Sequence, residues 1–237
     1  MSYGSLQYVD SIGTTYLFRG PSPVTDGEFD YTGLVAAIQD NPAPPTPVPD
    51  NFYLVDISLL NTNEGAEIGA EIAYFEANPA AGELQWWETL GTPQCYFQTD
   101  PNGRDALVSS LDQWFPEPLI WRVATLRNWL QNPPQSGPVV IYVHCDGGCD
   151  RTGEMIGAYM LRYMNMNWSD MYAANRPCAL KNGQPWPPAC PNYCALQWYA
   201  FWLNTQSFGL APITEIGDDG GCFDWATRTV VQGCPAD

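Results

Sequence analysis

The apolar positions of this 237-residue sequence fall into continuous runs and into helical periods. The runs YLVDISLL at 53–60 and VVIYV at 139–143 are largely apolar and rich in β-favouring residues, and CYFQT at 95–99 is a third candidate strand. Strands that are apolar on both faces are typical of a parallel sheet covered on both sides. The pattern therefore predicts an α/β fold with a central, mainly parallel sheet flanked by helices.

Apolar residues spaced three or four apart predict helices over 119–130, 156–163 and 193–203. The segment NPAPPTPVPD at 41–50 has five prolines, which exclude a helix or a central strand, so it is expected to be a surface loop. One domain is predicted over 1–237, with a core over about 16–206. The Cys- and Gly-rich tail at 207–237 lacks periodicity and is expected to pack on the surface.

Charge narrows the range of partners. The chain has 9 Lys and Arg against 26 Asp and Glu, a formal net charge of −17. Nucleic acid is not expected as a partner, because its phosphates would meet a repelling field. No run approaches the ~20 apolar residues of a membrane span, and the first thirty residues lack a signal-peptide pattern. A highly phosphorylated substrate is disfavoured more than a small phosphoester.

Cysteine content indicates the compartment. Eight cysteines, 22 prolines and a single lysine favour an extracellular or secretory setting, with the cytoplasm as the alternative. Cys178, Cys190, Cys194, Cys222 and Cys234 are expected to form disulfides of unspecified connectivity. One histidine and no tandem Cys-x-x-Cys pairs argue against zinc ligation by these cysteines, so no metal and no cofactor are predicted. The aromatic content is compatible with a homo-oligomer or polymer and equally with a monomer core.

Candidate chemistry is concentrated in VHCDGGCDRTGE at 143–154, between a predicted strand and a helix expected to begin near Thr152. A loop whose backbone N–H groups converge at a helix N-terminus binds anions, because the amides and the helix dipole both favour negative charge. Gly147 and Gly148 allow such a loop to curl around phosphate oxygens. The same field stabilises Cys145 as a thiolate, and Arg151 supplies a planar fork for two phosphoryl oxygens.

The sequence HCDGGCDRTG resembles the His-Cys-x5-Arg-Ser/Thr signature of cysteine-based protein tyrosine and dual-specificity phosphatases. The resemblance implies Cys145 as the nucleophile, Arg151 as the phosphate clamp, Thr152 as a hydroxyl that assists the leaving thiolate, and His144 as a support of the thiolate. It also implies a substrate-binding loop made of Asp146, Gly147, Gly148, Cys149 and Asp150. YLFRGPSPVTDGEFD at 16–30 and LVDISLLNTNEGAE at 54–67 resemble segments of atypical dual-specificity phosphatases, and Arg19 is expected to anchor the first of them to an acidic partner.

Phosphoryl transfer to sulfur also needs an acid for the leaving oxygen. Asp112, in DQWFPEPLIW and 33 residues before Cys145, resembles the acid of tyrosine phosphatases and is the first choice. The Trp-Pro that usually precedes that acid is missing here, since Ser110 and Leu111 occupy those positions. Asp100 resembles the acid of dual-specificity members. Asp150, beside the arginine as in myotubularin-type lipid phosphatases, is a third candidate, and a solvated or helix-capping role is the alternative for Asp112 and Asp100.

The function predicted from these residues is phosphomonoester hydrolysis through a phosphocysteine, acting on a phosphoprotein or a small phosphoester. One alternative is an inactive, disulfide-stapled secreted scaffold with a phosphatase-like fold, in which all eight cysteines are paired. A further alternative is an inositol phosphate or phosphoinositide phosphatase, although this loop has no lysine or second arginine for such a headgroup. If Cys145 is free, at least one more cysteine must be unpaired, and Cys149 is the expected one, poised to form a reversible disulfide with Cys145.

Overall fold

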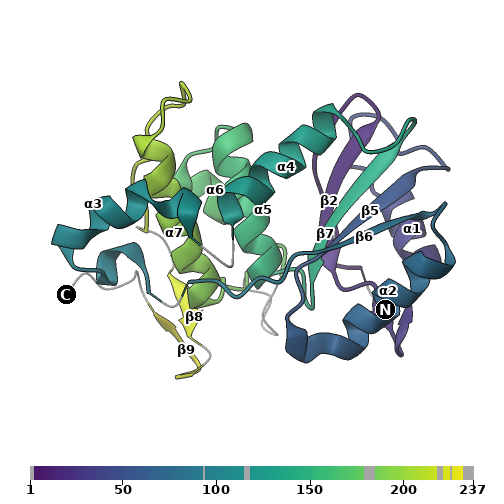
Figure 1. The fold of residues 1–237 in the computed structure, drawn as a ribbon, viewed down its shortest axis with the longest axis horizontal. Helices are drawn as coiled ribbons and strands as arrows, with labels where there is room; N and C mark the ends of the chain where they lie inside the picture. Colours follow the sequence, from purple (N-terminus) through teal and green to yellow (C-terminus); the bar gives the residue numbers. More distant parts are fainter. Residues whose placement is uncertain are drawn as a thin grey trace. The chain divides into compact units, whose positions relative to one another are not determined.

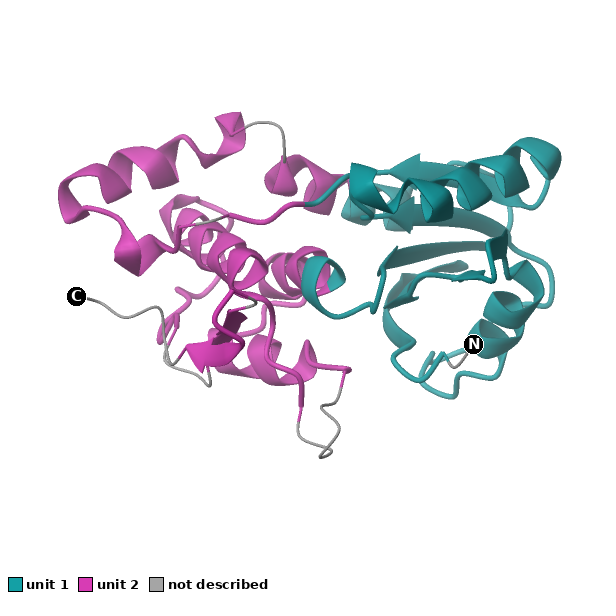
Figure 2. Cartoon of the chain, turned by 90° about the horizontal axis from the view of Figure 1, so that it is seen from below, with its two compact units in different colours: residues 1–89, 126–152 teal, residues 90–125, 153–237 magenta. Residues whose placement is uncertain are grey.

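The computed structural model describes residues 3–92, 94–114, 118–178, 185–217, 221–224 and 226–231 (Figure 1). The chain divides into two compact units, which Figure 2 distinguishes by colour. Unit 1 consists of residues 1–89 and 126–152, and unit 2 consists of residues 90–125 and 153–237. The single domain over 1–237 stays a prediction.

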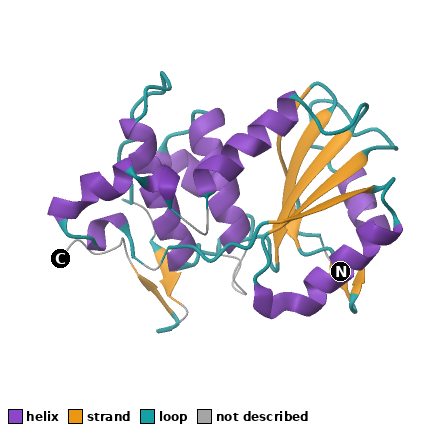
Figure 3. Ribbon diagram, in the orientation of Figure 1, coloured by secondary structure: helices purple, strands orange, loops and turns teal. Residues whose placement is uncertain are grey.

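Unit 1 is built on a five-stranded sheet, whose strands are among those drawn in orange in Figure 3. Its spatial order is β1 (Gln7–Ile12), β2 (Thr15–Pro21), β7 (Val139–Cys145), β5 (Tyr53–Ser58) and β6 (Gly82–Trp86). The pairs β2·β7, β7·β5 and β5·β6 are parallel, whereas β1 pairs antiparallel with β2 at one edge. The predicted α/β class with a mainly parallel sheet is confirmed.

One face of this sheet is covered by α1 (Tyr31–Gln39) and α2 (Gly65–Ala77). Leu34 and Ile38 of α1 and Phe75 of α2 pack with Phe18 and Val140 of the central strands in one buried cluster. A short hairpin, β3 (Val24–Thr25) and β4 (Glu28–Phe29), and the 3-10 turn η1 (Thr62–Glu64) complete this side. Burial of both faces of β7, whose seven residues are all buried, explains why its sequence is continuously apolar.

Two of the three predicted strands are confirmed. The run at 53–60 forms β5, which ends at Ser58, and the run at 139–143 forms β7, which continues through Cys145. The predicted strand at 95–99 is wrong, because Tyr96–Gln98 is a 3-10 turn, η2, in unit 2. Cys95 there is buried in a disulfide with Cys194, so its apolar neighbours pack against a helix rather than in a sheet.

Unit 2 is mainly helical. It contains η2, α3 (Pro101–Ser109), the 3-10 turn η3 (Leu111–Gln113), α6 (Trp168–Ala174), α7 (Cys190–Thr205) and a hairpin of β8 (Cys222–Asp224) and β9 (Thr229–Val231). Two helices continue from one unit into the other, α4 (Leu119–Gln131) and α5 (Asp150–Tyr163). Helix α7 is buried nearly all round, as its aromatic and aliphatic residues on every face require.

The three predicted helices are confirmed as α4, α5 and α7, although α5 begins at Asp150, two residues earlier than expected. Residues 41–50 form neither helix nor strand, as their prolines predict. In the tail, the disulfide from Cys222 to Cys190 fixes the short hairpin to the start of α7. Cys234 lies outside the described residues. Among the helices of the described residues, none has the length and apolarity that crossing a bilayer requires.

Candidate functional site

Cys145 is the last residue of the central strand β7, and its side chain is buried in unit 1. Within the described residues it is the free cysteine. The loop 146–149 follows, and α5 begins at Asp150. The sulfur thus lies where a strand ends and a helix begins, the arrangement that the sequence predicts for an anion-binding loop.

Three successive carbonyls of the loop accept hydrogen bonds from segments that surround it. The Ser22 N–H donates to the Asp146 carbonyl at 2.9 Å, and the Ser5 hydroxyl donates to the Gly147 carbonyl at 3.2 Å. The Arg19 guanidinium donates to the Gly148 carbonyl at 2.8 Å. In a trans peptide the N–H points opposite to the carbonyl. The following amides are therefore turned to the other side, which is the orientation that a phosphate-binding loop requires.

Gly148 is required at its position for two reasons. Its φ of +72° is left-handed, and a Cβ atom there would lie 2.3 Å from the Gly20 carbonyl oxygen. Gly147 does not have this constraint, because the nearest atom to a Cβ there is the Cys149 Sγ at 3.4 Å. The loop therefore lies against β2 at a distance that only glycine permits.

Arg19, fully buried in β2, donates to the Gly148 carbonyl and so anchors its segment to the loop. An acidic partner for Arg19 stays a prediction. Burial lowers the pKa of Arg19 to about 10, and the electrostatic interaction with Cys145 acts in the opposite direction. The guanidinium therefore has two effects on the loop. It fixes the loop backbone, and it places positive charge near the Cys145 sulfur.

Arg151, in the first turn of α5, is held by Glu64 from η1. Its Nη1 and Nη2 donate to the two carboxylate oxygens of Glu64 at 2.5 and 2.8 Å, and Nη1 also donates to the Leu59 carbonyl at 3.3 Å. Burial disfavours the charge of Arg151, but Glu64 and Cys145 more than offset it, so the pKa of Arg151 lies above its ordinary value. The planar guanidinium is thus fixed in orientation at the loop.

Below the loop, His144 lies in a fully buried polar cluster with Asp56 and Ser58 of β5 and Glu71 of α2. The His144 Nε2 lies 3.2 Å from Asp56 Oδ1 and 3.4 Å from Glu71 Oε1. Burial alone would lower the pKa of His144, but the charges of Asp56 and Glu71 raise it to about 9. Burial raises the pKa of Glu71 to about 7. His144 is thus a buried histidine, compatible with the supporting role that the resemblance implies.

The other predicted residues of the loop differ in exposure. Asp146 is exposed, Asp150 is half-buried at the start of α5, and Thr152 is fully buried, with no hydrogen-bond partner for its Oγ1. The prediction that Cys149 is unpaired and poised to bond Cys145 is wrong, because Cys149 is disulfide-bonded while Cys145 is free. The physical reason is that a cysteine can form only one disulfide, and that of Cys149 is already made.

The two acids predicted upstream belong to unit 2, whereas the loop belongs to unit 1. Asp112 is exposed in η3. Asp100 is the N-cap of α3, where its carboxylate accepts from the Asn102 N–H at 2.9 Å, which is the helix-capping role weighed for it. Asp150 is the candidate acid that lies in unit 1 itself.

Sequence reasoning did not identify Glu64, Asp56 or Glu71. Glu64 had a detectable signal, since Asn61 and Glu64 form a capping box whose spacing is readable in NTNE. The sequence signals for Asp56 and Glu71 were weaker, since one is an acid inside an apolar strand and the other an acid on a helix. Only the packing of α2 on β5 brings both to His144.

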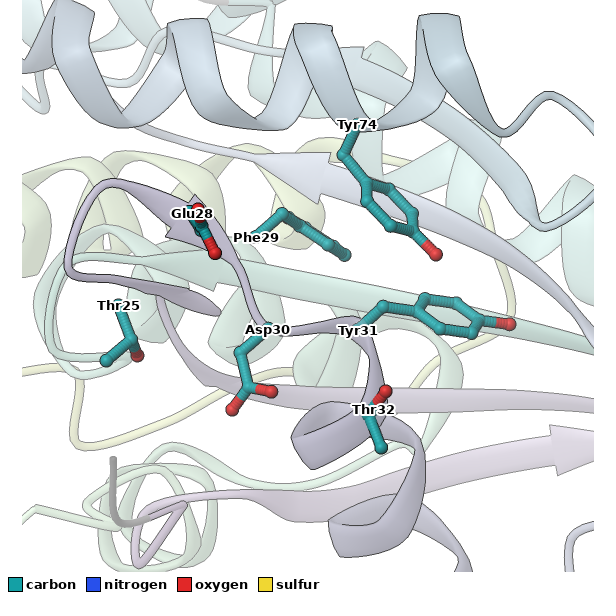
Figure 4. Close-up of a pocket in the computed structure, with 7 residues that line it drawn as sticks. All are labelled: Thr25, Glu28, Phe29, Asp30, Tyr31, Thr32 and Tyr74. Atoms are coloured by element: carbon teal, nitrogen blue, oxygen red, sulfur yellow. The ribbon is translucent and has the colours of Figure 1, made fainter.

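A separate hollow of about 340 Å³ lies in unit 1 beside the β3–β4 hairpin (Figure 4). Figure 4 shows the rings of Tyr31 and Tyr74 side by side, with the carboxylates of Glu28 and Asp30 nearby. The seven lining residues include neither a cysteine nor a basic side chain. This hollow is therefore not suited to phosphate, and the loop after β7 is the candidate site.

Comparison with known proteins gives likeness of fold only. No family model matches the chain, and no curated protein matches it. Among solved structures, PTPMT1 in complex with PI(5)P is 15% identical with a TM-score of 0.47, over 84% of this chain and 96% of that one. The human tyrosine phosphatase-like serine/threonine/tyrosine-interacting protein is 13% identical with a TM-score of 0.45, over 79% and 93%. Kinase associated phosphatase is 11% identical with a TM-score of 0.43, over 83% and 90%.

Proposed function

We propose that this protein hydrolyses phosphomonoesters, with Cys145 as the nucleophile. One observation carries the proposal. A free, buried cysteine ends the central strand, at a loop whose carbonyls are held outward and whose arginine is held by Glu64. A nucleophile, a set of backbone amides and a planar cation at one helix N-terminus are what in-line transfer of a phosphoryl group to sulfur needs.

The reaction has two steps. The Cys145 thiolate attacks phosphorus, the bond from phosphorus to the ester oxygen breaks, and a carboxylic acid protonates the leaving oxygen. Water then attacks the phosphocysteine, the S–P bond breaks, and inorganic phosphate and the thiolate are released. Arg151 and the loop amides hold the equatorial oxygens in both steps, and the Thr152 hydroxyl assists the departing sulfur.

Asp112 is our proposed acid, with Asp100 and Asp150 as alternatives. The N-cap bond of Asp100 to Asn102 competes with such a role, because it fixes that carboxylate on its own helix. Asp150 would act from within the loop itself. Replacing each aspartate by asparagine distinguishes the three candidates. The amide retains the shape and hydrogen bonding of the carboxyl group but has no proton to give.

The substrate class that we favour is a small phosphoester or a phosphoprotein. The net charge of −17 slows the approach of a polyanion, and the exposed carboxylate of Asp146 adds repulsion at the loop. An inositol phosphate is the alternative substrate, to be compared directly with phosphotyrosine. A phosphoprotein partner, rather than nucleic acid, fits this charge.

The inactive scaffold is the second candidate function. It is favoured by the disulfides Cys95–Cys194 and Cys190–Cys222, which suit an oxidising compartment, and we propose an extracellular or secretory location on that ground. A scaffold with all eight cysteines paired requires Cys145 to be oxidised, and its free thiol weighs against that reading. A self-assembling role would appear as a concentration-dependent mass in solution.

Hydrolysis of p-nitrophenyl phosphate tests the proposal. The wild-type chain is expected to turn over this ester, and Cys145→Ser is expected to abolish turnover, because a serine hydroxyl is not ionised there. Glu76→Gln, at an exposed position on α2, controls for substitution as such and should retain the wild-type rate. A Cys145→Ser rate equal to that of wild type would overturn the proposal, and a wild-type protein inert to every phosphoester would favour the scaffold.

A further inference from the structure

We propose that Asp56, Glu71 and His144 form a buried site for one divalent transition-metal ion, behind the loop and separate from the phosphate site. Each of the three side chains is fully buried. One ligand atom from each, the carboxylate oxygens and an imidazole nitrogen, lies within 4.8 Å of the others.

The first support is that the cluster is unsatisfied. Both oxygens of Asp56, both oxygens of Glu71 and both ring nitrogens of His144 lack hydrogen-bond partners, and so does the buried Ser58 Oγ nearby on β5. The His144 Nε2 contacts both carboxylates at ion-pair distance, and these contacts leave Asp56 Oδ2 and His144 Nδ1 without a partner. Buried polar groups are nearly always satisfied, so this concentration points to a missing occupant.

The charges of the buried carboxylates also favour a bound cation. Carboxylate oxygens only accept hydrogen bonds, so the two buried carboxylates of Asp56 and Glu71 require a cation or a donor beside them. With a neutral imidazole the two carboxylates carry two negative charges, which one divalent cation balances. A single imidazole nitrogen and carboxylate oxygens make a mixed nitrogen and oxygen ligand set, which suits Zn²⁺ and its neighbours in the first transition row better than Mg²⁺ or Ca²⁺.

The distances between the ligand atoms also fit a metal site. Metal–ligand distances of ~2.0–2.2 Å in a tetrahedral zinc site place the ligand atoms ~3.4 Å apart. The His144 Nε2 lies 3.2 Å from Asp56 Oδ1 and 3.4 Å from Glu71 Oε1. Ser58 is the register partner of His144 in the β5·β7 pair and carries a further buried oxygen. Two paired strands and a helix thus supply the ligands from rigid elements.

The consequence of a bound ion is structural. It would tie β5, β7 and α2 together directly below Cys145, and it would fix the ring of His144, the residue before the nucleophile. In this account the ion takes no part in the attack on phosphorus. It acts as a brace for the strand end from which Cys145 projects.

The test is the metal content of tag-free protein, measured by plasma mass spectrometry after growth and purification with Zn²⁺ and gel filtration. All variants carry Cys145→Ser, so that the thiolate cannot hold the metal and activity plays no part in the readout. The parent is expected to hold about one ion per chain, and Glu71→Gln and Asp56→Asn are expected to lose it. Glu76→Gln, an exposed acid on the same helix, is the control and should retain it.

Thermal unfolding supplies the second readout. Removal of the ion with a chelator should lower the melting temperature of the parent and of Glu76→Gln, and added Zn²⁺ should restore it, whereas Glu71→Gln should not respond. Circular dichroism shows whether each variant folds. If one of Glu71→Gln and Asp56→Asn fails to fold, the other decides the test. A parent that holds no metal and does not respond to Zn²⁺ or Mn²⁺ would overturn the proposal, because protons or water would then balance the cluster. Retention of metal by both folded variants would overturn it as well.

Discussion

Glu64 binds both terminal nitrogens of Arg151, with Nη1 on one carboxylate oxygen and Nη2 on the other. The pair joins the turn after β5 to the first turn of α5, so the guanidinium plane is set before any phosphate arrives. Such preorganisation removes part of the ordering that the transition state would otherwise require.

We therefore predict that Glu64→Gln lowers kcat/KM for an aryl phosphate about tenfold, a loss of about 1.4 kcal/mol in transition-state binding. The amide keeps one acceptor for Arg151 and loses the other. Arg151→Lys is expected to reduce kcat/KM by about two orders of magnitude or more, because an ammonium cannot reproduce the fork. Steady-state kinetics checks both, with the exposed Glu76→Gln as control. A larger loss for Glu64→Gln than for Arg151→Lys would contradict these roles.

The tight contact between Gly148 and Gly20 gives a prediction about stability. Gly148→Ala should lower the free energy of unfolding by about 2 kcal/mol or more, because its Cβ would clash with a backbone carbonyl and the residue would keep a left-handed φ. Gly147→Ala is the matched control and should cost much less, since its Cβ meets only ordinary contact at 3.4 Å. Urea denaturation of the two variants measures the difference, and equal losses would show that the loop does not lie against β2.

A third prediction concerns the general acid. Asp112→Asn should lower kcat and remove the fall in activity at high pH, because the amide has no proton to lose. Asp150→Asn and Asp100→Asn should keep that fall. A substrate with an activated leaving group, such as p-nitrophenol, should be affected less than a phenyl ester. If Asp150→Asn is the variant that loses the high-pH fall, the acid lies within the loop, as the resemblance to myotubularin-type loops implies.

Acid should weaken the Glu64–Arg151 pair. Burial raises the pKa of the Glu64 carboxyl, but the hydrogen bonds from Arg151 and from the Asn61 N–H more than offset this, so the pKa in the folded protein lies below its ordinary value of 4.5. A group with a lowered folded pKa stabilises the protein above its unfolded pKa and loses that contribution as the pH falls through the folded value. The stability difference between wild type and Glu64→Gln should therefore be constant near neutrality and shrink below about pH 4.5. A difference that stays constant down to pH 2 would contradict the pairing.

The two described disulfides should contribute unequally to stability. Cys95–Cys194 closes a span of 99 residues and Cys190–Cys222 a span of 32. In the chain-entropy account, removal costs about 4 to 5 kcal/mol for the longer loop and about 3 to 4 kcal/mol for the shorter one. Paired Cys→Ala variants, compared by guanidinium denaturation, test the ranking. The reverse ranking would place the main effect of these bonds in the folded state.

Two strands of unit 1 were predictable from the sequence, because β5 and β7 are buried and read as continuous apolar runs. The inner strand β2, the edge strands β1 and β6, and the turn at 95–99 were not. Of the residues in β1 only Val9 is buried, so its sequence lacks the apolar run that marked the others. At 95–99 a disulfide and ring stacking impose a 3-10 turn on residues with strand propensity.

Some residues of the candidate site were predictable from the local sequence, and others were not. Cys145, Arg151 and the glycines are local in sequence, and the spacing of strand, loop and helix predicts how they act. Glu64, Arg19, Asp56 and Glu71 are 74 to 126 residues away from Cys145 along the chain, and only tertiary packing brings them to the loop and to His144. Their roles follow from contacts that no local pattern encodes.

The central claim is that phosphate passes through Cys145, and a rapid acid quench during turnover of a labelled aryl phosphate tests it most directly. We predict a covalent phosphate on the peptide that contains Cys145, at up to about one per chain, which forms and decays at rates consistent with kcat. Cys145→Ser should show no label and no turnover. Turnover without any label on that peptide, or undiminished turnover by Cys145→Ser, would contradict the account.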